Sequence, residues 1–268
     1  MTVLYERAPI VEVSLSVQFN SLKGFLSPHA GKVWAAFESD FPTVEQYPPL
    51  PATIEQADIA PRGQIVGSVG APTPRIWMIN GSRTELIQFQ PDRFIRNWRN
   101  YADATGNLPY PNYAALKENF SKDHEKFLGT LVELKLPQPQ INQYELSYVN
   151  WIRPSGVWEN HGEIDKVFQH WNEGFADSFN GEFESAAMQI TKKIEKSGKF
   201  IARLYFSATP MTVPGQNGME QIYQTSTLVR GFSDGPMMGF FNMAHDNVIE
   251  VFESVFSTEL QKAWGRGK

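Results

Sequence analysis

The chain has 268 residues, 41% of them hydrophobic and 20% charged, so it is large enough for one big domain or two fused halves around a well-filled core. It contains no cysteine, which excludes disulfides, thiolate catalysis and cysteine-ligated metals. The formal net charge of −5 disfavours nucleic acid as a partner, and the lack of an apolar leader or membrane-spanning stretch predicts a cytoplasmic protein without membrane contact.

The chain begins with a strand and a short helix. Residues 10–19 alternate between apolar and polar side chains, which predicts a strand with one buried face. A helix is predicted at 27–41, where Ser27 is a suitable N-cap. The proline-rich stretch 42–51 indicates an extended connector, and 53–59 is expected to form a strand.

Further strands and a long helix complete the first half. After a Gly- and Pro-rich loop at 61–74, a strand is predicted at 75–80, and Asn80-Gly81 favours a hairpin. Residues 84–99 form either one long strand or two strands joined at Pro91-Asp92. Apolar residues at helical spacing then predict a long helix from 111 to 136.

The second half follows the same order of elements. A strand at 141–152 and a short helix from 164 come first. Further strands and a long helix follow, and Thr258 with Gln261 resembles a capping box that starts a last short helix. The later strands are predicted at 185–194, 200–209 and 222–232, and the long helix at 241–255.

A short sequence repeat accompanies this order. Val11-Glu12-Val13-Ser14 returns as Tyr144-Glu145-Leu146-Ser147, half a chain later. We therefore predict an α+β protein of two pseudo-repeats, residues 1–137 and 138–268, each with a strand, a short helix, antiparallel strands and a long helix. The two are expected to pack as one curved-sheet unit, by analogy with the TATA-binding-protein-like saddle or the helix-grip folds.

The stretch Gln88–Arg99 is unusually rich in arginine, amide and aromatic side chains. On a strand, Arg93, Asn97 and Arg99 share one face and Trp98 lies on the other. Two guanidinium groups with a carboxamide could grip an anion. Alternatively, the arginines pair with carboxylates on neighbouring strands and Trp98 belongs to the core.

The same stretch carries a family resemblance. Gln88–Arg99 matches a Q-x-Q-x-D-R-F-x-x-N-W-R signature, Pro9-Ile10-Val11-Glu12 matches a PIVE opening strand, and Tyr110-Pro111 and Tyr148-Val149-Asn150 match weaker elements. With these, the chain resembles a sporadically distributed bacterial family of similar length that has no established activity. The resemblance implies no catalytic residue or cofactor. The patchy distribution of the family is similar to that of defence or toxin–antitoxin genes.

No motif for catalysis, metal binding or phosphate binding is evident, so no cofactor is predicted. Glu12 and Glu145 occupy equivalent repeat positions. They are interpreted as an acid–base pair, as exposed strand residues, or as partners of Arg93 and Arg99. The lysine-rich hairpin at 192–199 suggests either a nucleic-acid surface or, more simply, a solvated sheet edge.

The leading prediction is a non-catalytic binding protein that holds a protein partner or a small anionic ligand. One alternative is a nucleic-acid-binding protein that uses a concave sheet, and the other is an enzyme with a dispersed Glu and His site. The candidate binding residues are Glu12, Arg93, Asn97, Trp98, Arg99, Glu145, Tyr148 and Asn150.

Overall fold

The structure, a computed structural model, describes residues 5–58, 73–100, 110–171, 181–215, 218–233 and 235–267. Over these residues the chain is mixed α+β, with nine strands and five helices. The strands are β1 (Ile10–Phe19), β2 (Thr43–Tyr47), β3 (Arg75–Ile79), β4 (Glu85–Gln90), β5 (Arg93–Arg99), β6 (Ile141–Ile152), β7 (Met188–Lys196), β8 (Lys199–Gly215) and β9 (Gly218–Gly231). The helices are α1 (Ser27–Phe37), α2 (Tyr113–Glu133), α3 (Ile164–Val167), α5 (Met237–Val255) and α6 (Thr258–Ala263).

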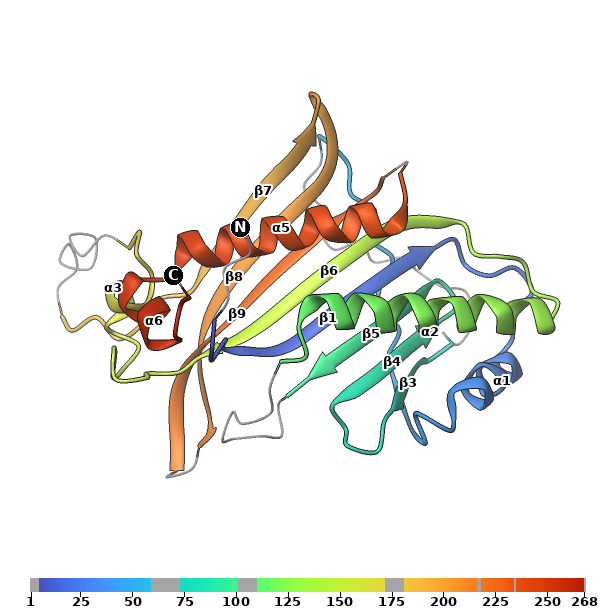
Figure 1. Cartoon of the computed structure of the whole chain (residues 1–268), viewed down its shortest axis with the longest axis horizontal. Helices are drawn as coiled ribbons and strands as arrows, with labels where there is room; N and C mark the ends of the chain where they lie inside the picture. Colours follow the sequence, from blue (N-terminus) through green and yellow to red (C-terminus); the bar gives the residue numbers. More distant parts are fainter. Residues whose placement is uncertain are drawn as a thin grey trace.

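All nine strands form one antiparallel sheet in the order β2-β3-β4-β5-β1-β6-β9-β8-β7 (Figure 1). The pair β1 and β6 lies where strands of the first half of the sequence meet strands of the second. In that pair Ser14 is directly opposite Ser147, which are the last residues of the two copies of the short sequence repeat. The opening strands of the two halves therefore pair with each other along most of their length.

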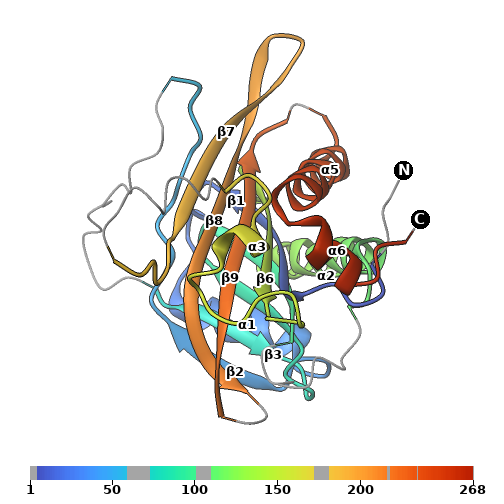
Figure 2. The same ribbon diagram turned by 90° about the vertical axis from the view of Figure 1, so that its left-hand side faces the viewer.

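The long helices α2 and α5 cover one face of this sheet, and a segment of irregular chain crosses the other (Figure 2). We call this segment, residues 50–57, the strap, and we call the face that it crosses the helix-free face. The strap follows β2 and is drawn in light blue in both figures. No helix in the described ranges is long and apolar enough to cross a membrane.

Aromatic side chains fill the layer between helices and sheet. Phe94 of β5 stacks on Phe127 of α2 with ring centroids 5.0 Å apart, and Phe120 of α2 contacts Phe241 of α5 edge-on at 5.2 Å. On the second half of the sheet, Tyr144 of β6 lies 5.2 Å from Phe240. Such contacts add specific geometry to the burial of large apolar surfaces, so one aromatic core joins both long helices to the sheet.

The predicted elements agree with the structure where their pattern is local. Residues 84–99 form a hairpin, β4 and β5, joined at Pro91-Asp92, and the strand at 141–152 has the predicted bounds. The short helix after 164 ends at Val167, because Phe168 is extended and bridges to Phe256.

Two predictions for the segment after α1 are wrong, and one cannot be assessed. Residues 43–47, expected to be an extended connector, form the edge strand β2. Residues 53–58, expected to form a strand, belong to no strand. The predicted loop at 61–74 lies outside the described residues except for its last two positions.

Gly231 marks a very close approach of β9 to β8. A Cβ atom added there would lie 2.2 Å from the carbonyl oxygen of Ile201 and 2.6 Å from Cα of Ala202, so the backbone would have to shift. We expect Gly231→Ala to lower the free energy of unfolding, measured in urea, by about 2 kcal/mol. The control is Gly129→Ala in α2, where a Cβ meets nothing within 4 Å.

The control variant should gain about 0.5–1 kcal/mol from improved helix propensity. Equal unfolding free energies for the two glycine variants would contradict the close approach.

Candidate functional site

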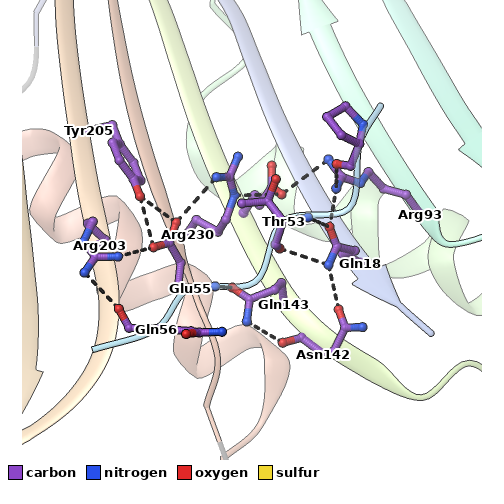
Figure 3. Close-up of polar contacts among 12 residues, drawn as sticks. Gln18, Thr53, Glu55, Gln56, Arg93, Asn142, Gln143, Arg203, Tyr205 and Arg230 are labelled. Atoms are coloured by element: carbon purple, nitrogen blue, oxygen red, sulfur yellow. Dashed lines mark hydrogen bonds and ion pairs between the residues drawn. The ribbon is translucent and has the colours of Figure 1, made fainter. Parts of the chain in front are cut away.

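Two rows of polar side chains cross the helix-free face, because the strand register places them directly opposite one another. The first row, across β4, β5, β1 and β6, consists of Gln90, Arg93, Gln18 and Gln143. The second row, across β6, β9 and β8, consists of Glu145, Arg230 and Arg203. With Tyr205 these residues form what we call the strap site, and the labelled ones point toward the strap in Figure 3.

Glutamine side chains of the first row bind the main chain of the strap. The amide of Gln90 accepts from the N–H of Leu50 and donates to its carbonyl, both at 2.9 Å. In the same way, the amide of Gln18 accepts from the N–H of Thr53 and donates to its carbonyl, both at 3.0 Å.

Gln143 extends this pattern by accepting from the N–H of Glu55 at 3.2 Å. The glutamines thus take the place of a neighbouring strand, satisfying backbone groups that would otherwise be buried without partners. This explains how the backbone of Thr53 and Glu55 is satisfied although residues 53–58 form no strand.

The carboxylate of Glu55 lies in the second row. Its Oε2 is 2.5 Å from Nη1 of Arg203, and the hydroxyl of Tyr205 lies 2.8 and 3.0 Å from the two carboxylate oxygens. Nη1 of Arg230 is 3.5 Å from Oε1. The Glu55 side chain is only 1% exposed and that of Arg203 is 3% exposed. A buried carboxylate with this many donors is compensated by charge-assisted hydrogen bonds.

The partners of Glu55 keep the protonation states that this contact needs. Burial alone lowers the pKa of Arg203, but hydrogen bonds and charge from Glu55 and Tyr205 outweigh burial and raise it above its ordinary value. Burial, together with the hydrogen bond to Glu55, raises the pKa of Tyr205 to about 12. Arg203 is therefore a cation and Tyr205 a proton donor throughout the neutral range.

Glu145 joins the two rows electrostatically. Its Oε1 lies 3.4 Å from Nη1 of Arg93 and 3.0 Å from Nε of Arg230. Neither contact has hydrogen-bond alignment, since Glu145 Oε1 and Arg230 Nε are buried and have no hydrogen-bond partner in the described part of the chain. Arg93 also donates to the side chain of Gln18 and, at 3.2 Å, to the carbonyl of Pro51. The pairing of Arg93 with Glu145 is one of the alternatives expected from the sequence.

The other predicted residues of this face lie farther from the strap. Asn97 donates to Glu12 at 2.5 Å and accepts from Gln88 at 2.8 Å. The guanidinium of Arg99 lies 5.4 Å from the ring centre of Trp77. Arg93, Asn97 and Arg99 share one face as predicted. However, four and six residues of strand, roughly 13 and 20 Å, separate Arg93 from Asn97 and from Arg99, so they do not converge on one anion.

Three predicted binding residues lie on the opposite face, in the layer under the helices. Trp98 contacts Tyr110 edge-on at 5.5 Å, and the hydroxyl of Tyr110 is 3.0 Å from that of Tyr148. Asn150 donates to Thr225 at 3.3 Å. Trp98, Tyr148 and Asn150 are all buried. The structure therefore places them in the core, where they support the sheet and do not meet the strap.

The residues of the enzyme alternative do not form one site. Glu12 is opposite Val149 and Glu145 is opposite Ser16, so four residues of strand, roughly 13 Å, separate the two glutamates. His124 packs on Phe94 on the other face of the sheet. Among the residues that the structure describes, no group of three His, Asp or Glu side chains is arranged to hold a metal ion.

The sequence did not point to the residues that hold Glu55. The lysine hairpin does form an edge: Lys192, Lys193 and Lys196 are exposed on β7, the last strand of the sheet. Arg203, which follows it, is instead buried beneath the strap. The available signals were the polar alternation of β1, which places Gln18 on the helix-free face, and an acidic residue, Glu55, that follows the proline-rich connector by four positions.

Comparisons with models of protein families, with curated proteins and with solved structures find no match to this chain. Its function is therefore inferred from its own residues and their geometry.

Proposed function

We propose that this chain is a non-catalytic binding protein that holds an extended, acidic segment of a partner protein on its helix-free face. The strap is the observation that carries this proposal. It is an extended segment with an acidic residue, and the strap site holds it by its main chain and by its carboxylate. The partner segment would take the same place after displacing the strap.

The hydrogen bonds of the strap favour recognition of main chain over side chains. Gln90 and Gln18 each bind both backbone groups of one residue, and Ile54, between two bound residues, is 53% exposed. Affinity that comes from main-chain hydrogen bonds does not depend on most side chains of the ligand. A partner segment therefore needs an extended conformation and few particular residues.

The strap leaves part of the site unsatisfied. Among the described residues, Nε of Arg93 and Nε of Arg230 are buried and make no aligned hydrogen bond, although Glu145 Oε1 lies 3.0 Å from Nε of Arg230. Buried guanidinium donors without acceptors are costly, so a ligand with more acceptors can bind better than the strap does. This supports exchange of the strap for another segment.

A protein segment is favoured over nucleic acid as the ligand. The glutamines of the first row pair with peptide groups, and the arginines of the second row are balanced by Glu55 and Glu145. A phosphate backbone requires unbalanced positive charge, whereas this chain carries a net charge of −5.

We also propose that residues 1–137 and 138–268 are pseudo-repeats within one saddle-like unit. The strand order supports this, because β5 and β9 flank the central pair β1 and β6, and β4 and β8 lie next to them. In each half the last strand precedes the long helix. The family resemblance suggests a partner from a bacterial defence or toxin–antitoxin system.

The test uses the strap itself as the ligand in trans. In a strap-blank variant, residues 50–57 are replaced by Gly and Ser, which keeps the connection, removes the Glu55 carboxylate and makes the segment more flexible, so that its main chain competes less well for the site. A fluorescent peptide of residues 48–58, PPLPATIEQAD, is titrated against it and followed by anisotropy. We expect saturable one-to-one binding to the variant. We expect none to the unaltered chain, whose own strap competes at an effective concentration of about millimolar or more.

Folding of the strap-blank variant is checked by circular dichroism and urea unfolding. If it does not fold, Glu55→Gln, which weakens the strap without emptying the site, replaces it in the titration. A folded strap-blank variant that does not bind the peptide would show that the face accepts the strap only as part of its own chain, and the proposal would be wrong.

A further inference from the structure

We infer that Arg203, Tyr205 and Arg230 form a carboxylate subsite that selects a glutamate at a fixed position in the bound segment. That position is two residues after the one whose N–H and carbonyl both pair with Gln18, as Glu55 follows Thr53 in the strap. This inference rests on the proposed binding of an extended segment, and it adds the side chain by which the segment is chosen.

The donors of the subsite match a carboxylate. In the Glu55 carboxylate, Oε2 pairs with Arg203 and Oε1 pairs with Arg230. The hydroxyl of Tyr205 lies within 3.0 Å of both oxygens. An uncharged amide in the same place would offer one oxygen and present an N–H group to donors. The subsite should therefore distinguish glutamate from glutamine, although the two side chains have the same shape.

The length of the side chain is selected as well. The main chain is held on both sides of the carboxylate-bearing residue, since Gln143 accepts from the N–H of Glu55 and Arg203 donates to the carbonyl of Gln56 at 2.9 Å. With the backbone held there, aspartate is shorter by one methylene and cannot reach Arg203 and Tyr205 together. Glutamate is therefore preferred over aspartate.

The charge of the subsite requires an anion. Arg93, Arg203 and Arg230 lie around Glu55 and Glu145. When the carboxylate of Glu55 is absent, Arg203 and Arg230 lose the anion that they share, and the positive charge of the three guanidinium groups exceeds the negative charge of Glu145. A bound phosphate group would bring a third oxygen to a place where the Glu55 side chain is already only 1% exposed, and it would lie near Glu145. We therefore assign the subsite to carboxylates and not to phosphorylated residues.

The experiment compares four peptides of residues 48–58 on the folded strap-blank variant. They carry glutamate, glutamine, aspartate or phosphoserine at the position of Glu55. We expect the glutamine peptide to bind about tenfold more weakly than the glutamate peptide, because it loses charge-assisted hydrogen bonds in a buried site. The aspartate and phosphoserine peptides should also bind more weakly than the glutamate peptide.

A second substitution shows that the preference arises at this subsite. Tyr205→Phe in the strap-blank variant removes one donor and should reduce the ratio of glutamate to glutamine affinity. The control is Tyr223→Phe, which removes another buried hydroxyl, one that donates to the carbonyl of His161 at 2.8 Å on the other face of the sheet. The control should leave the ratio unchanged.

The outcomes separate this inference from the proposed function. Equal affinities for the glutamate and glutamine peptides would overturn the carboxylate subsite and leave segment binding intact. Tightest binding of the phosphoserine peptide would assign the subsite to phosphorylated partners and also overturn it. Failure of all four peptides to bind would contradict the proposed function itself.

Discussion

Replacement of Glu55 by alanine should lower the free energy of unfolding by about 3–5 kcal/mol, because it removes the carboxylate that compensates buried guanidinium charge. Arg203 would keep its buried guanidinium without the carboxylate 2.5 Å away, and Tyr205 would lose the acceptor of its hydroxyl. Among the described residues, Arg230 would retain Glu145 as its one charged partner. Equilibrium unfolding in urea at pH 7 measures this loss.

The matched control is Glu133→Ala, which removes an exposed glutamate at the end of α2. A surface change of this kind should alter the free energy of unfolding by no more than about 0.5 kcal/mol. Similar losses for Glu55→Ala and Glu133→Ala would mean that the strap is not held through its carboxylate. They would also remove the basis for the carboxylate subsite.

Acidification should destabilise the protein through His124. This side chain lies among Phe94, Phe120 and Phe127, and burial lowers its pKa to about 4 from an ordinary value of 6.5. Between pH 4 and pH 6.5 the imidazole of His124 is therefore neutral in the folded protein and protonated in the unfolded chain. The resulting stability is fully present above pH 6.5 and is lost as the pH falls toward 4, by about 3 kcal/mol in total.

Urea unfolding at pH 7 and at pH 4 gives the size of this loss. Between pH 7 and pH 4 the free energy of unfolding of His124→Leu should fall by about 3 kcal/mol less than that of the unaltered chain, because leucine does not titrate. His170→Leu, which removes an exposed histidine, serves as the control and should leave the acid-induced loss unchanged. The same loss in His124→Leu as in the unaltered chain would contradict a buried neutral His124.

Several elements could be predicted because their signals are local. The alternation of residues 10–19 predicted β1, and the same rule placed Arg93 and Trp98 on opposite faces of β5. Apolar spacing predicted α2, whose buried residues include Phe120 and Phe127. Each of these signals depends on neighbours within one strand or within a few helical turns.

Contacts between distant residues decided the candidate site. Glu55 meets Arg203 across 148 positions of sequence, and Gln18 meets Thr53 across 35. The wrong prediction of a strand at 53–59 has the same cause, because glutamine side chains from β1 and β6 took the backbone groups that a neighbouring strand would have used. Periodicity could not indicate this, since a side-chain amide satisfies the backbone as well as a strand does.

By itself the sequence determined the two faces of β1 and β5, the amphipathic helices and the α+β class, because these follow from the alternation of polar and apolar side chains along the chain. Only the tertiary structure decided that Gln18, Gln143 and Arg203 all lie beneath the strap. The register between strands far apart in sequence places those side chains together, and the register depends on packing of the whole sheet against its helices.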